Sequence, residues 1–146
     1  MDKLVEAGAR LADETGFELL TGAALARHFD VKLASLYFHI PSFDDLKSRI
    51  ALFALQELAD RATDALAGRT GKDALAALAN VYRDYARAHP GRFAAARHPV
   101  SAERAAESAG GQLVRMTAAV LRGYDLPETE QRRTRSVCSA ASSWAT

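Results

Sequence analysis

The chain has 146 residues, of which 49% are hydrophobic, and a formal net charge of +1, which fits one domain or two small helical ones. This composition excludes a disordered chain, and the near-neutral charge gives no overall basic field that would attract nucleic acid. Cys138 is the single cysteine, and the sequence shows no charged-then-apolar leader. No apolar run approaches the roughly 18 residues of a membrane span. These features predict a soluble cytoplasmic protein without disulfides.

Helical periodicity dominates the sequence, and no alternating run of β-branched residues predicts a strand. Three helices are predicted in the first forty residues, over about 2–15, 22–29 and 32–39. Thr21 is a good N-cap for the second of them, and Pro41 ends the third because the residue before a proline is pushed out of the helical region. The expected fold class is therefore all-α.

The rest of the chain continues the helical pattern with short breaks. Ser42 with Asp45 resembles a capping box that opens a long helix through Leu66. The break at Gly68–Gly71 has neither the glycine spacing nor the preceding strand of a phosphate loop, so it is read as a linker. The further helical segments are expected over about 70–88, around Phe93, over 102–122 and from 128 onward.

The second and third short helices have the pattern of a helix-turn-helix, which needs small or apolar residues where the helices cross. Leu25, Ala26 and Phe29 are predicted to form the buried face of the first helix of the pair. Asp30 is expected at the turn, where a positive φ is tolerated, and Val31 is expected to fill the core after it.

Leu36 and Ile40 are predicted to bury the inner side of the second helix of the pair. A recognition helix meets the major groove with its outward positions. In this chain these positions are Lys32, Leu33, Ser35, Phe38 and His39.

Residues 20–46, LTGAALARHFDVKLASLYFHIPSFDDL, resemble the DNA-binding module of the TetR family of transcriptional regulators, and the resemblance extends over about residues 3–50. Its most specific parts are Leu25-Ala26, Val31, Leu36-Tyr37-x-His39 and Pro41-Ser42-x-Asp44-x-Leu46. The resemblance implies that Thr21, Tyr37 and His39 bind phosphates. It also implies that base edges are faced by Lys32, Leu33, Ala34 and Ser35, with Phe38 completing the DNA-binding set.

Three positions depart from the family pattern. Asp30 replaces the turn glycine, Lys32 replaces a small hydroxyl residue, and Phe43 replaces a phosphate-binding lysine. Residues 1–50 hold six Lys/Arg against eight Asp/Glu, a net charge of −2, and the basic N-terminal arm of the family is absent. Since phosphate neutralisation supplies most non-specific affinity, this head is expected to bind DNA weakly and to be salt-sensitive.

The C-terminal part is similar to the WHG-type subgroup through Tyr82-x-x-x-Ala86-x-x-His89-Pro90-Gly91. The resemblance implies a helix-turn-helix domain over 1–50, joined by a long helix to a helical effector-binding and dimerisation domain over 51–146. Members of this subgroup continue with another long helix beyond the position of Thr146, so the second domain is expected to lack its last helix.

Aromatic residues of the second domain are candidates for lining an effector pocket, because ligands of helical domains bind between helices. The alternative is that these side chains are simply core. The candidates are Tyr82, Tyr85, Phe93, Met116 and Trp144.

The sequence therefore predicts a homodimeric, ligand-responsive regulator, a repressor that a small effector releases from a palindromic operator. No catalytic set, metal site or cofactor is expected, because no Ser/His/Asp or Cys/His group can be assembled and His89 and His98 lie nine residues apart with no thiolate nearby in the sequence. The alternative is a helical ligand-binding or protein-interaction module that has lost DNA binding, which the acidic head, Asp30 and Phe43 favour.

Overall fold

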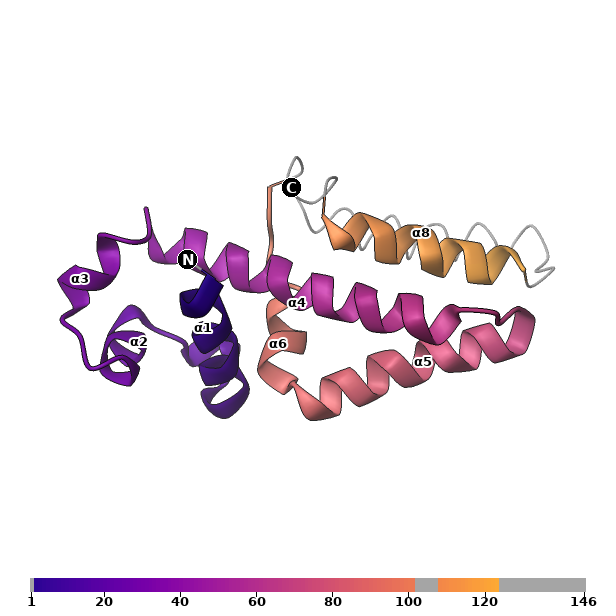
Figure 1. Ribbon diagram of the computed structural model, residues 1–146, viewed down its shortest axis with the longest axis horizontal. Coiled ribbons are helices and arrows are strands. Elements are labelled where there is room, and N and C mark those ends of the chain that lie inside the picture. Colours follow the sequence, from indigo (N-terminus) through magenta and orange to yellow (C-terminus); the bar gives the residue numbers. More distant parts are fainter. Residues whose placement is uncertain (1, 102–107, 124–146) are drawn as a thin grey trace. The chain divides into compact units, whose positions relative to one another are not determined.

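The computed structural model describes residues 2–101 and 108–123, and every regular element in them is helical (Figure 1). The predicted all-α class is confirmed. The elements are α1 (Asp2–Thr15), the 3-10 turn η1 (Phe17–Leu19), α2 (Gly22–His28), α3 (Leu33–Tyr37), α4 (Phe43–Leu66), α5 (Gly71–Ala88), α6 (Pro90–Ala95) and α8 (Ala109–Arg122).

The chain forms two compact units. The head unit comprises the residues up to Ala54 together with Tyr85–His98, and the second unit comprises Leu55–Asp84 with the described residues from Pro99 onward. Helices α4 and α5 each pass from one unit into the other. The segment Tyr85–His98, which was predicted to lie in the effector domain, thus belongs to the head unit, where α6 packs against α1 and η1.

Local capping explains where the helices begin and end. Gly16, with a φ of 93°, ends α1 in a conformation that favours glycine. The side chain of Thr21 accepts a hydrogen bond from the Ala24 amide at 3.1 Å, and Ser42 Oγ accepts one from the Asp45 amide at 3.0 Å. The predicted caps of the second and fourth helices are confirmed.

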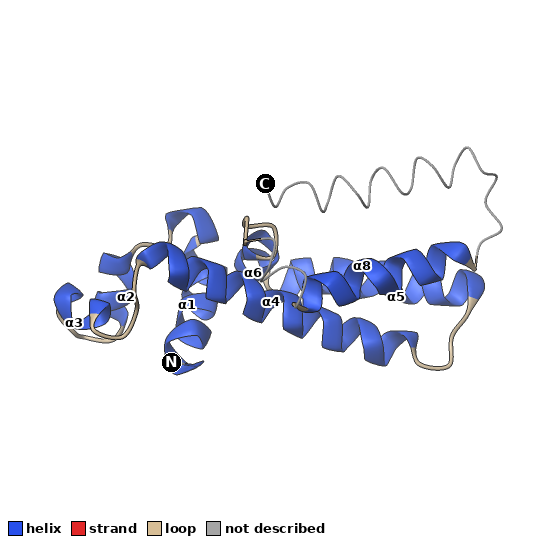
Figure 2. Cartoon of the chain, turned by 90° about the horizontal axis from the view of Figure 1, so that it is seen from above, coloured by secondary structure: helices blue, strands red, loops and turns tan. Residues whose placement is uncertain are grey.

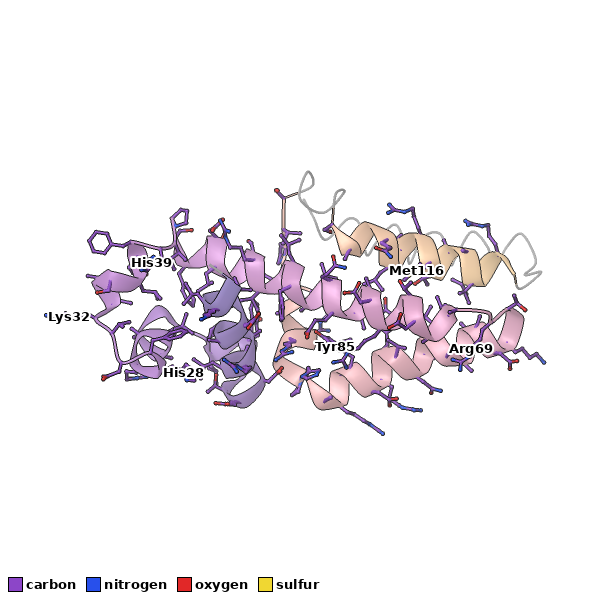
Figure 3. All side chains as sticks on the ribbon, viewed as in Figure 1. His28, Lys32, His39, Arg69, Tyr85 and Met116 are labelled. Atoms are coloured by element: carbon purple, nitrogen blue, oxygen red, sulfur yellow. The ribbon has the colours of Figure 1, made fainter. Side chains whose placement is uncertain are left out.

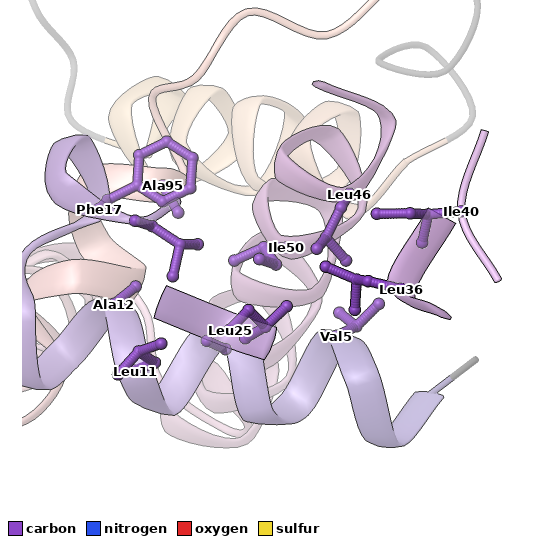
Figure 4. Packing of buried hydrophobic residues seen from close by; sticks show 12 residues of the cluster. Val5, Leu11, Ala12, Phe17, Leu25, Leu36, Ile40, Leu46, Ile50 and Ala95 are labelled. Carbon is purple, nitrogen blue, oxygen red and sulfur yellow. The ribbon is translucent and has the colours of Figure 1, made fainter. Parts of the chain in front are cut away.

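The head unit is held together by a single hydrophobic cluster that draws on α1, η1, α2, α3, α4 and α6 (Figure 4). Leu25, Leu46 and Ile50 are fully buried in it, and Leu36 is 3% exposed. Because α3 is only five residues long, its place depends on the apolar side chains it contributes here rather than on its own hydrogen bonds. The cluster consists of Val5, Ala9, Leu11, Ala12, Phe17, Leu20, Leu25, Leu36, Ile40, Leu46, Ile50 and Ala95.

Helix α6 docks on α1 through a close backbone approach. Gly91, in the first turn of α6, is buried, and a Cβ atom at this position would overlap the backbone of Ala12 and Asp13. Only glycine allows two backbones to approach this closely. Figures 1 and 2 both show α1 lying between the α2–α3 pair and α6.

The same junction contains the carboxylate of Asp13. Its Oδ1 accepts a hydrogen bond from the Arg92 amide at 2.8 Å, while its Oδ2 lies 3.0 Å from Arg92 Nε and 3.2 Å from His89 Nδ1. His89 precedes α6 and makes no side-chain capping bond. A carboxylate from α1 therefore satisfies an amide that the first turn of α6 leaves without a helical partner.

The second unit contains the end of α4, most of α5 and α8. Leu58, Leu78 and Leu113, one from each helix, are buried. The side-chain amide of Gln112 donates to Thr63 Oγ1 at 3.3 Å, which joins α8 to α4. The sequence predicted a helix over 102–122; in the structure Ser108 caps α8, and residues 102–107 are outside the described part of the chain, as is the helix expected from 128 onward.

Candidate nucleic-acid interface

A tight turn joins α2 to α3 in the geometry of a helix-turn-helix. Asp30 has a φ of 53°, and its amide lies 3.2 Å from the carbonyl oxygen of Arg27. The Val31 amide donates to the Ala26 carbonyl at 2.9 Å, which closes the end of α2. The prediction that Asp30 adopts the positive φ of the turn is confirmed.

Two residues predicted in the core are on the surface instead. Phe29 is 39% exposed and Val31 is 44% exposed, so the predictions that Phe29 belongs to the buried face and that Val31 fills the core are wrong. The space at the helix crossing is already filled by Leu25 and Leu36, and Phe29 makes an edge contact with the His28 ring, whose centroid is 5.5 Å away. The predicted burial of Ala26 and Ile40 is confirmed.

Helix α3 and its flanks are exposed at every residue from Asp30 to His39 except Leu36. Lys32 precedes the helix, Leu36 is its one buried residue, and Phe38, which follows it, is 87% exposed. Figure 3 shows Lys32 and His39 extending outward from this end of the head unit. All of the predicted DNA-binding residues are exposed, on α3, its flanks and the N-cap of α2; they are Thr21, Lys32, Leu33, Ala34, Ser35, Tyr37, Phe38 and His39.

Gly22 lets α3 pack closely on the beginning of α2. A Cβ atom at Gly22 would lie 3.1 Å from Leu33 Cδ1, 3.6 Å from the Tyr37 hydroxyl oxygen and 3.7 Å from Phe43 Cδ2. One edge of Leu33 and the hydroxyl end of Tyr37 are therefore held beside Gly22, the residue that follows Thr21. The rest of each side chain stays in solvent, with 42% of Leu33 and 48% of Tyr37 exposed.

Three cations of the head have different surroundings. The Nε of Arg49 lies 2.6 Å from a carboxylate oxygen of Asp45, one helical turn earlier in α4. The ammonium of Lys47 lies 5.2 Å from the ring centroid of Phe17 and 5.9 Å from that of Phe43, within the range of cation–π attraction. Lys32 is exposed at the entry to α3.

The candidate pocket residues are divided between the two units. Tyr85 and Phe93 lie in the head unit, where Tyr85 is fully buried and its hydroxyl donates to the Ala54 carbonyl at 3.2 Å. Tyr82 and Met116 lie in the second unit and are half-buried; the Met116 sulfur is 3.6 Å from Thr63 Oγ1. Trp144 lies outside the described residues. Their role in ligand binding stays a prediction.

No pattern in the sequence predicted the contacts of Asp13 with His89 and Arg92. The residues are 76 and 79 positions apart from Asp13, so no local pattern connects them. The His-Pro-Gly run was the one sign of an unusual local requirement, because a glycine directly after a helix-initiating proline suggests a close approach.

Within residues 2–101 and 108–123, no helix is both long and apolar enough to cross a bilayer. A family model described as "Tetracyclin repressor-like, C-terminal domain" matches residues 75–144. The chain is also 32% identical over 138 residues to the uncharacterized HTH-type transcriptional regulator YobS of Bacillus subtilis (strain 168), a match that covers 93% of this chain and 72% of that protein.

Two further comparisons agree with these. The chain is 34% identical over 94 residues to the uncharacterized HTH-type transcriptional regulator Rv0681 of Mycobacterium tuberculosis (strain ATCC 25618 / H37Rv), covering 64% of this chain and 43% of that one. A crystal structure of a possible TetR family transcriptional regulator from Streptomyces coelicolor A3(2) has the same fold, with a TM-score of 0.62 and 22% identity over 97% of this chain and 67% of that one. The chain belongs to the TetR family of helix-turn-helix transcriptional regulators.

Proposed function

We propose that this regulator acts in the cytoplasm as a homodimeric repressor, which binds a palindromic operator and is released by a small effector. The observation that carries the proposal is the exposure of Thr21 and of residues 32–35 and 37–39, held in place by the buried Leu25 and Leu36. A residue set that is exposed yet rigidly positioned suits contact with DNA better than a role in packing. We propose no enzymatic activity for this chain.

In this proposal α3 lies in the major groove. Tyr37, His39 and Thr21 contact phosphates and fix the register, while Lys32, Leu33, Ala34 and Ser35 face base edges. One head buries only about 600–1,000 Å² on DNA, so specific affinity requires two heads on half-sites about one helical turn, or a multiple of it, apart. Asp45 beside Arg49 offsets positive charge at the beginning of α4, which reduces phosphate neutralisation and supports weak binding.

The effector is proposed to bind among the helices after residue 50. Because α4 begins beside the helix-turn-helix and ends in the second unit, a ligand that favours one position of α4 changes the separation of the two heads. The ligand binds the two positions of α4 with different affinities, and the ratio of these affinities sets how far it can shift operator binding.

The test is capture of genomic DNA fragments by the protein at low salt, followed by sequencing of the bound pool. Sedimentation of the same sample establishes whether it is a dimer. A palindromic site enriched over random fragments supports the proposal. A dimer that enriches no fragment overturns it, and leaves the alternative of a ligand-binding or protein-interaction module without DNA binding.

Tyr37→Phe is expected to weaken binding to every DNA sequence by about tenfold, since a hydrogen bond to a charged group contributes roughly 1.5 kcal/mol or more. The measurement is fluorescence anisotropy on the captured site and on a scrambled duplex. Thr70→Val, which removes an exposed hydroxyl of the second unit, serves as the control and leaves both affinities unchanged. A loss confined to the captured site would place Tyr37 on a base instead of a phosphate.

Lys32→Ala is expected to relax the preference at one base pair of each half-site, because a lysine in the major groove pairs best with the O6 and N7 of guanine. The measurement compares bound pools selected by the two proteins from a randomised duplex. Lys72→Ala, at an exposed lysine of α5, is the control and leaves the preference unchanged. A uniform loss of affinity with a smaller salt dependence would instead assign Lys32 to the phosphate backbone.

A further inference from the structure

The exposed apolar side chains of the head are concentrated at its recognition surface. Val31, Leu33, Tyr37 and Phe38 are 44%, 42%, 48% and 87% exposed, and all four lie within eight residues of one another. Single exposed apolar residues are ordinary, but a run of them beside a binding site marks a surface that a partner covers. The partner of this surface in the proposed function is DNA.

The same segment holds few of the groups that read bases by paired hydrogen bonds. Residues 29–40 contain no Arg, Asn or Gln, which are the residue types that form bidentate contacts with guanine and adenine. Lys32 is the one strong donor at the entry to α3, and Ser35 the one hydroxyl in its first turn. Hydrogen bonds alone therefore specify little of a half-site.

Apolar contact is the remaining direct readout. In the major groove thymine carries a C5-methyl group that cytosine and the purines lack, and aliphatic side chains recognise it by contact. Leu33 and Ala34 occupy the first turn of α3, the part of a recognition helix that reaches base edges. Leu33 is also positioned for this task, because its Cδ1 rests over Gly22 while the rest of the side chain is exposed.

We propose that this regulator reads its operator mainly through thymine methyl groups, with Leu33 and Ala34 as the specificity-determining contacts beside Lys32. The proposal rests on the DNA-binding function proposed above and names the base that its recognition helix selects. Each half-site then contains adjacent thymines next to the base pair that Lys32 contacts. Burying one methyl group changes affinity about three- to fivefold, so two thymines in each of two half-sites give substantial discrimination.

The test removes the methyl groups without changing any base pair. The chain selects a duplex from a random-sequence DNA library, and the selected duplex is then synthesised with deoxyuridine in place of each thymidine in turn. We expect a three- to fivefold loss of affinity at one or two positions per half-site and none elsewhere. Methylating cytosine at C5, in duplexes that carry C in place of T at those positions, restores part of the affinity.

A protein variant links the effect to α3. In Leu33→Ala the penalty for uracil disappears at the position that Leu33 contacts, because the variant no longer touches the methyl group. Val114→Ala, which changes an exposed apolar residue of α8 in the second unit, keeps the full penalty and is the matched control. Circular dichroism spectra are recorded for both variants to check that they remain folded.

The possible failures are distinguishable. If a duplex is selected and bound but tolerates uracil at every position, or if Leu33→Ala retains the full penalty, the methyl-reading proposal is wrong while the DNA-binding function stands. If Leu33→Ala instead alters self-association at unchanged DNA affinity, the apolar surface belongs to a protein contact and the proposal is likewise wrong. If no duplex is enriched, the proposed function fails and the inference fails with it.

Discussion

Replacing Gly91 by alanine lowers the free energy of unfolding by about 3 kcal/mol or more, the upper range for overpacking a buried site. The added Cβ would overlap the backbone of Ala12 and Asp13, and a helix backbone cannot rotate away as a side chain does. The head unit must then separate α6 from α1 or distort one of them. Since domains of this size are stable by only about 5–15 kcal/mol, the loss is readily measured by urea denaturation followed by circular dichroism.

Gly8→Ala is the matched control, since Gly8 is also a buried glycine of the head unit. Its added Cβ would meet chiefly the end of the Ile50 side chain, 2.7 Å from Cδ1, and alanine is the better helix former inside α1. The rearrangement of one side-chain end and the gain in helix propensity oppose each other, so a change within about 1 kcal/mol is expected. Equal destabilisation by both variants would show that the contact of Gly91 with α1 has no special importance.

Asp13→Ala is expected to lower the free energy of unfolding by about 2–4 kcal/mol. The variant removes the acceptor of the Arg92 amide and the anion that lies 3.0 Å from Arg92 Nε and 3.2 Å from His89 Nδ1. The side chains of Asp13 and Arg92 are 16% and 13% exposed, so water replaces these interactions poorly. Thermal and urea denaturation measure the decrease in the free energy of unfolding. Because salt screens a partly buried ion pair less than a surface pair, this decrease depends only weakly on salt concentration.

Two further variants separate charge from hydrogen bonding. Asp13→Asn keeps one oxygen that accepts a hydrogen bond from the Arg92 amide but loses the negative charge. Its free energy of unfolding is therefore expected to fall by about half as much as that of Asp13→Ala. Asp84→Ala removes the partner of Arg83 in a pair whose side chains are more than half exposed, and is expected to cost less than about 1 kcal/mol. If Asp13→Ala costs no more than Asp84→Ala, the junction of α1 and α6 does not depend on this carboxylate.

The helices were largely predictable because their ends are determined locally. The predicted first helix coincides with α1, since the positive φ of Gly16 forces an end at that point. The hydroxyl of Ser42 begins α4 as expected, and the break at Gly68–Gly71 separates α4 from α5. In each case a residue with a strong conformational preference lies at the boundary, and no distant contact opposes it.

The burial of the turn between α2 and α3 was not predictable in the same way. A helix has a period that assigns its faces, whereas Phe29 and Val31 follow the last full turn of α2 and precede α3, where no period applies. Hydrophobic character alone suggested that they were buried. Their exposure depends on how completely Leu25 and Leu36 fill the crossing, which is a property of three-dimensional packing.

The exposure of Lys32, Leu33, Ser35, Phe38 and His39 was predictable, because the spacing of the apolar Leu36 and Ile40 assigns these five residues to outward positions. The junction of Asp13, His89 and Arg92 was not, because it joins residues on helices far apart in the chain. The same limit applies to the candidate pocket residues. Their aromatic character suggested one site, but Tyr85 lies in the head unit and Tyr82, three positions earlier, lies in the second unit.

The short recognition helix is anchored chiefly through Leu36 and the following Ile40, while most of its other side chains are in solvent. Substitutions at Ala34, Ser35 or Phe38 therefore alter little of the hydrophobic cluster and change folding only slightly, as surface substitutions usually do. In the proposed function these positions contact the operator, so a substitution there changes the DNA contacts while it leaves the fold nearly unaltered. The head could then acquire a new target sequence by single substitutions, without an intermediate that fails to fold.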